Sequence, residues 1–120
     1  MPETNPIGEA IAKAARDDYA NRERGHIDIP EWSIDGQPSR IWFRPMTMAE
    51  AYDIRSYKQE DGPQYAQVYA IIIKAEDELG KRLFTLEHEQ VLLKQVAVDV
   101  VRRISDAILA GPRVATAKKD

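Results

Sequence analysis

The chain has 120 residues, enough for one domain with a modest core. Its 17 lysine and arginine residues against 20 aspartate and glutamate residues give a formal net charge of −3, so the whole molecule has no general attraction for nucleic acid or anionic lipid. The absence of cysteine excludes disulfides, thiolate nucleophiles and cysteine-based zinc sites, and fits a reducing cytoplasm.

The longest purely apolar run, Tyr69 to Ile73, is much shorter than the ~20 residues that a membrane-spanning helix needs. The N-terminal residues also lack the basic start and the apolar region of a secretion signal. We therefore expect a cytoplasmic protein with no membrane contact.

A first helix is predicted from Pro6 to about Arg22, because Asn5 can accept free backbone N–H groups and proline suits the first turn. Its thin apolar face consists of Ile7, Ala10, Ile11, Ala14 and Ala15. A face of this kind docks weakly, so we expect residues 1–25 to form a mobile N-terminal extension and residues 26–112 to form one globular domain.

A β-hairpin is predicted next, because β-branched and aromatic residues flank the turn residues 35–38. Alternation places Ile41 and Phe43 on one face and Arg40, Trp42 and Arg44 on the other. Pro30 cannot donate a ladder hydrogen bond, so the first strand should lie at an edge or be broken there. A two-stranded ribbon must also lie against helices to be stable.

Two further helices follow the hairpin. Thr47 and Glu50 have the spacing of a capping box, which predicts a helix from Met48 to about Tyr57. Another helix should begin near Gln64, continue through Leu79 and end at Gly80 in a left-handed cap. Its apolar arc is wide, so it should be the central and most buried element.

The last predicted helix is one long rod from Leu86 to Ala110, which Thr85 begins and residues 111–112 end. One broad stripe of this helix should face the core; it comprises Leu86, Leu93, Val96, Ala97, Val100, Val101, Ile104, Ala107 and Ile108. A second, narrower stripe of Val91, Val98 and Leu109 is a candidate contact for a partner, although isolated exposed apolar residues are also normal on soluble proteins. Residues 113–120 should form a flexible tail. The fold class is therefore mainly helical α+β: an N-terminal helix, a β-hairpin, and three helices ending in a long C-terminal helix.

The sequence offers no catalytic motif, and we predict a protein that is not an enzyme and has no cofactor or metal site. Of the two histidines, His26 is expected in a turn and His88 in the first turn of the last helix, and neither accompanies a nucleophile motif. The acidic segment before Gly80 fails as a calcium loop, because Ala75, Leu79 and Leu86 occupy positions that need oxygen ligands. Basic residues near the C-terminus leave a small DNA-binding regulator as an alternative, although cations at a helix end also complement its dipole; these residues are Arg102, Arg103, Arg113, Lys118 and Lys119.

From Ile27 to Leu109 the chain resembles the tail assembly chaperones of long-tailed bacteriophages and related prophages. The resemblance rests on a hairpin ending in the aromatic-Arg-Pro-Met-Thr stretch at 42–47, an apolar helix, an acidic Gly-Lys turn leading into Leu-Phe-Thr at 76–85, and a final helix with a Val/Ile face. The N-terminal helix lies outside it.

This resemblance implies a non-enzymatic factor of the host cytoplasm that coats the tape measure protein, keeps it soluble and recruits tail tube protein during tail assembly. It also implies a homo-oligomer. A surplus apolar stripe on a helix would suit the helical tape measure protein, so the candidate contacts are Val91, Val98 and Leu109, with the exposed ribbon residues Trp32 and Trp42 second. A structural tail or neck component is a further alternative.

Overall fold

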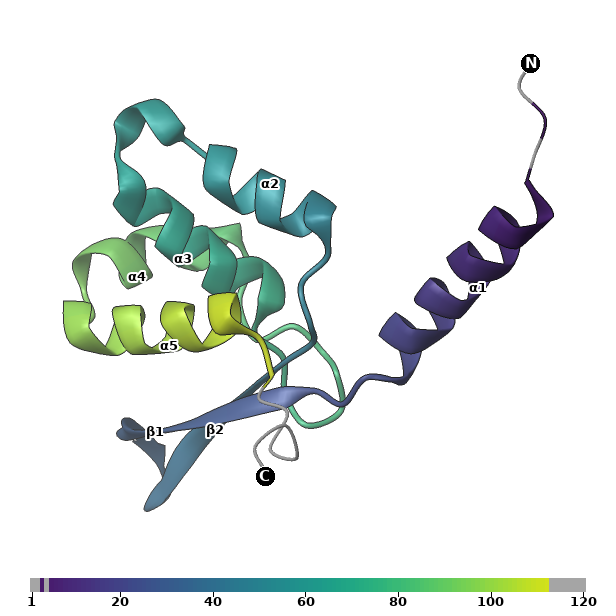
Figure 1. The fold of residues 1–120 in the computed structure, drawn as a ribbon. Coiled ribbons are helices and arrows are strands. Elements are labelled where there is room, and N and C mark those ends of the chain that lie inside the picture. Colours follow the sequence, from purple (N-terminus) through teal and green to yellow (C-terminus); the bar gives the residue numbers. More distant parts are fainter. Residues whose placement is uncertain (1–2, 4, 113–120) are drawn as a thin grey trace.

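The computed structural model describes residue 3 and residues 5–112 and confirms a mainly helical α+β fold (Figure 1). The helices and strands are α1 (Pro6–Asn21), β1 (Gly25–Ile34), β2 (Gln37–Phe43), α2 (Met48–Ser56), α3 (Pro63–Lys74), α4 (Glu89–Lys94) and α5 (Val98–Ala110). Two short 3-10 helices, Gln59–Asp61 and Leu86–His88, precede α3 and α4. Within the described residues, no helix is both long and apolar enough to cross a lipid bilayer.

The core forms around α3, as the width of its apolar arc predicts. Helix α3 contacts α2, α4 and α5 and lies between α2 and α5 in Figure 1. Its side chains Val68, Ile71 and Ile72 are almost completely buried. Helix α5 covers them with Val100, Val101, Ile104 and Ile108. The hairpin adds Ile29, Ile41 and Phe43 to the same core, which is how the two-stranded ribbon gains its stability.

The hairpin turns at Asp35 and Gly36, which both have positive φ, as a two-residue type I′ connection requires. The predicted alternation of β2 is confirmed for Ile41 and Phe43, which are buried, and for Arg40, which is exposed. The strand register shifts between Ile29 and Ile34, the segment that contains Pro30, so the predicted irregularity of the first strand is also confirmed.

Helix α1 begins as predicted, because the Asn5 side chain accepts hydrogen bonds from the backbone N–H groups of Ile7 and Gly8. None of its residues is buried, and Figure 1 shows it projecting away from the other helices. Its C-terminal end is attached to the body by Tyr19, whose hydroxyl donates to the Pro45 carbonyl at 2.9 Å.

The capping box that begins α2 is present with both of its hydrogen bonds. Helix α3, however, ends at Lys74, and the predicted continuation to Leu79 is wrong. Residues 75–83 instead form a loop, in which Leu79 is 84% exposed. Gly80 has the expected positive φ, but this left-handed conformation forms part of the loop and does not cap a helix.

The single long helix from Leu86 to Ala110 is also wrong, because residues 95–97 separate α4 from α5. Leu92 is buried, yet in one continuous helix it would point well away from the buried face of α5, at 100° per residue. The break lets both faces turn towards α3. As a result two residues of the predicted core stripe, Leu86 and Ala97, are exposed.

Candidate interaction surfaces

Trp42 is not the exposed ribbon residue that was predicted. Its side chain is half-buried beneath neighbouring groups: His26 lies 4.8 Å away between ring centroids, and the Arg24 guanidinium carbon lies 4.7 Å from the indole centroid. His26 itself lies in β1 and not in a turn. The alternation placed Trp42 on the correct face, but the sequence gives no sign that other side chains cover that face. Trp42 is therefore part of a local packing cluster.

The backbone of Trp42 joins two distant segments of the chain. Its N–H donates to the Glu76 carbonyl at 2.9 Å, and its carbonyl accepts from the Glu76 N–H at 2.8 Å. Glu76 in turn forms a bridge with Arg82. The loop 75–83 is thereby attached to the free edge of β2.

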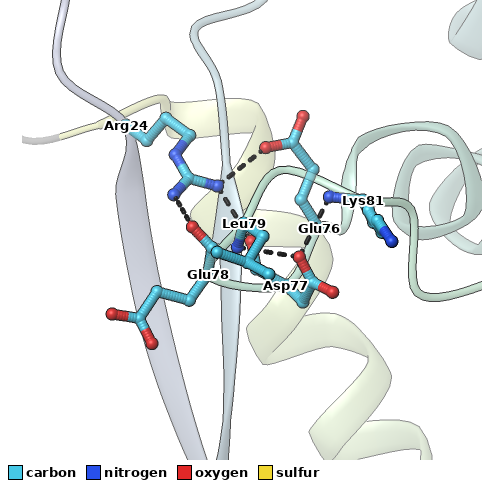
Figure 2. Close-up of polar contacts among 6 residues, drawn as sticks. All are labelled: Arg24, Glu76, Asp77, Glu78, Leu79 and Lys81. Carbon is cyan, nitrogen blue, oxygen red and sulfur yellow. Dashed lines mark hydrogen bonds and ion pairs between the residues drawn. The ribbon is translucent and has the colours of Figure 1, made fainter.

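Arg24 holds this loop in place from the segment between α1 and β1 (Figure 2). Its guanidinium forms an ion pair with the Glu76 carboxylate at 2.9 Å and donates to the backbone carbonyls of Asp77 at 2.9 Å and Glu78 at 2.6 Å. The side chains of Arg24 and Glu76 are only 20% and 16% exposed. Charge-assisted hydrogen bonds with this little solvent access are among the stronger ones in a protein.

The tip of the loop is ordered by Asp77. Its carboxylate accepts from the backbone N–H groups of Leu79 at 2.9 Å and Lys81 at 3.0 Å (Figure 2). Arg24 therefore anchors the loop to the rest of the molecule, and Asp77 fixes its internal conformation. The apolar side chain of Leu79 lies in solvent at the tip of the loop.

Trp32, the other predicted ribbon contact, is half-buried and packs against the core. It also lines an open groove of about 570 Å³ between the distal hairpin and the segment 83–84, together with Ile34, Leu83 and Phe84. Glu31 beside it forms a two-pronged ion pair with Arg103 of α5, with N–O distances of 2.9 and 2.8 Å. Hydrogen bonding from Arg103 lowers the pKa of Glu31 to about 2.

The three predicted helix contacts are all exposed. Val91 is 41% exposed on α4, while Val98 and Leu109 are 59% and 50% exposed on α5. Because the helix is broken at residues 95–97, they do not form one continuous row. Their predicted role in partner binding stays a prediction.

Helix α1 carries an exposed apolar face. We define the α1 stripe as Ile7, Ala10, Ile11, Ala14 and Ala15, all of which are exposed. Ile7 and Ile11 are 70% and 63% exposed. The periodicity of these residues predicts only weak docking to the body, and in the structure the whole stripe is exposed.

The buried charged groups hold the fold together. Glu89 accepts from the Tyr57 hydroxyl at 2.5 Å and from the Lys58 ammonium at 3.1 Å, and these hydrogen bonds lower its pKa. The almost completely buried Lys74 donates to Glu50 at 2.8 Å and to the Pro45 carbonyl at 3.2 Å. Each buried charge therefore has a partner of opposite sign.

Two further predictions concern histidine and arginine. His88 is the last residue of the 3-10 helix Leu86–His88, and its Nδ1 atom accepts from the Thr85 N–H at 3.0 Å, which completes the capping box at the start of that helix. Arg103 is engaged by Glu31, whereas Arg102 is exposed. Arg113, Lys118 and Lys119 lie outside the described residues. Among the residues that are described, no group of three or more possible metal ligands lies together.

In comparisons with protein families, curated proteins and solved structures, the chain matches none of them.

Proposed function

We propose that this protein is a bacteriophage tail assembly chaperone that works in the host cytoplasm, coats the tape measure protein and recruits tail tube protein. The observation that carries the proposal is α1, a helix of 16 residues with an apolar stripe and no buried residue. Most of the stability of a helix in a protein comes from packing of its apolar face, so such a stripe gains most from contact with another polypeptide. A protein that solubilises apolar helices needs a surface of this kind.

A second observation supports the same proposal. Two of the segments that carry the family resemblance, 42–47 and 76–85, are distant in sequence, yet Trp42 and Glu76 exchange backbone hydrogen bonds. Arg24 reinforces that junction. These segments therefore form one structural unit.

Co-expression with the tape measure protein of the same phage or prophage tests the proposal. We expect the tape measure protein to be insoluble when expressed alone, and soluble and co-purified with this protein when both are present. A tape measure protein that stays insoluble and uncaptured would contradict the proposal.

Mass spectrometry of purified virions distinguishes a chaperone from a structural tail or neck component. A chaperone that leaves the finished particle should be absent from virions, whereas a structural component should be present in them. A DNA-binding regulator would instead show salt-dependent binding to DNA that falls when Arg102 is changed to alanine.

A further inference from the structure

The α1 stripe has the dimensions of a helix-binding surface. Its alanines, Ala10, Ala14 and Ala15, leave little side-chain bulk on the helix, so the backbone of a second helix can approach closely. Ile7 and Ile11 supply the larger apolar side chains and are mostly exposed. A partner that covers this face would bury apolar area that the protein itself leaves in water.

The attachment of α1 keeps the stripe available. Tyr19, whose hydroxyl donates a hydrogen bond to the Pro45 carbonyl, lies outside the stripe when residues are placed at 100° intervals around the helix. Arg24, just after the helix, is held by Glu76 and the loop backbone. The C-terminal end of α1 is thus attached to the body through Tyr19 and Arg24, which do not belong to the stripe.

The C-terminal end of α1 carries charges that oppose its own dipole. Asp17 and Asp18 lie near this end, and the last turn contains no basic residue. Carboxylates are unfavourable at the negative end of a helix dipole. Their ion pairs with Lys13 and Arg22 join side chains that are all more than half exposed, so these pairs are weak and exchangeable. A cationic partner near Asp17 and Asp18 would relieve this arrangement.

A second copy of α1 does not fit the same surface. Asp18 falls in line with the stripe at 100° per residue. In an antiparallel pair of α1 helices, each Asp18 would face the apolar half of the other stripe. In a parallel pair the two Asp18 carboxylates would lie side by side, and like charges repel.

We propose that α1 binds an amphipathic helix of another protein, which runs antiparallel to it and carries lysine or arginine near its own N-terminus. In this orientation both the basic side chains and the positive end of the partner's dipole lie beside Asp17 and Asp18. The binding surface follows from α1 alone. Its assignment to the tape measure protein rests on the proposed function.

Titration of the isotope-labelled full chain with synthetic peptides, followed by amide NMR signals, tests this inference. One amphipathic peptide has the length of α1, an alanine/leucine stripe and lysines in its first turns; a second peptide has glutamates in their place. We expect the lysine peptide to shift α1 signals saturably and to bind at least about 10-fold more tightly than the glutamate peptide.

Matched variants locate the contact. The double change Ile7→Gln/Ile11→Gln in the stripe should weaken binding of the lysine peptide by about 10-fold or more. The control Ala12→Gln/Ala20→Gln alters exposed, uncharged residues off the stripe and should leave binding unchanged. The change Asp17→Asn/Asp18→Asn should weaken binding about 3-fold or more although it removes the clash with the helix dipole, so loss of helix would not explain the result.

Several results would overturn the inference. The first is that the peptide shifts amide signals outside α1, and the second is that both peptides bind equally tightly. The third is that the stripe variant Ile7→Gln/Ile11→Gln binds the lysine peptide as tightly as the wild type. The fourth is that the free protein forms dimers that this variant does not form. The last result would assign the stripe to a second copy of the chain. If the peptide results hold but the tape measure protein is not captured, the surface stands and the proposed function fails.

Discussion

The guanidinium of Arg24 joins parts of the chain that are far apart in sequence. It contacts the indole of Trp42, the carboxylate of Glu76 and two carbonyls of the following loop. We expect Arg24→Ala to lower the free energy of unfolding by about 2 kcal/mol, because a hydrogen bond to a charged group contributes about 1.5–3 kcal/mol. Chemical denaturation measures this change.

The control for that variant is Arg44→Ala. Arg44 is exposed, and no polar partner is found for it among the described residues. Its removal should change the free energy of unfolding by no more than about 0.5 kcal/mol. Hydrogen exchange should also become faster at the Leu79 and Lys81 amides in Arg24→Ala only. Equal effects of the two variants would contradict the structural role of Arg24.

Glu89 should make stability depend on pH. Hydrogen bonds from Tyr57 and Lys58 hold its pKa in the fold below its ordinary value of 4.5. The unfolded chain therefore binds a proton first as the pH falls, so the stabilisation is complete above pH 4.5 and is lost as the pH falls through the folded pKa. Urea unfolding from about pH 7 down to about pH 3 should show a smaller loss of stability for Glu89→Gln than for the wild type. An identical pH dependence in Glu89→Gln and in the wild type would refute this role.

At the scale of elements, local signals predicted where most of them begin. Asn5 and Thr47 cap α1 and α2 through their own side chains, and the turn at Asp35 and Gly36 needs only local backbone preferences. Interactions of this kind act over a few residues, so one sequence is enough to identify them.

The structure departs from the predicted elements where distant residues decide the local conformation. The apolar pattern up to Leu79 predicts that the helix continues beyond Lys74. In the structure the chain forms a loop there, because Glu76 pairs with Trp42 and Arg24 binds the loop. The helix break at residues 95–97 contains neither glycine nor proline, and what favours it is the burial of Leu92 against the core. Tertiary packing of this kind overrides helix propensity. The contacts of His26 and Arg24 with Trp42 likewise depend on the tertiary structure.

The break can be tested by comparing two leucines. Leu92 is 4% exposed and Leu86 is 58% exposed. We expect Leu92→Ala to lower the free energy of unfolding by about 2–4 kcal/mol, because it leaves a cavity in the core, and Leu86→Ala to lower it by no more than about 0.5 kcal/mol. Denaturant titration measures both. The opposite order, with Leu86 more costly, is what a continuous helix with the predicted core stripe would give.

The whole molecule is more extended than a compact domain of its length. The radius of gyration over Cα atoms is 17.1 Å, whereas a compact chain of this size has about 14 Å. Figure 1 shows that α1 projects from a body in which the hairpin and the remaining helices share one core. Exposed apolar side chains are spread over this shape, with Leu79 on the loop and the candidate contacts Val91, Val98 and Leu109 on α4 and α5. Several weak contacts of this kind along one extended partner would give avidity without a deep pocket.

The central claim is that another polypeptide covers the α1 stripe. Hydrogen exchange of this protein with and without the tape measure protein tests it most directly. The amides of α1 should exchange rapidly in the free protein, because none of its residues is buried, and at least about 10-fold more slowly in the complex, while those of α3 remain unchanged. A complex in which α1 exchanges as rapidly as in the free protein would contradict the claim.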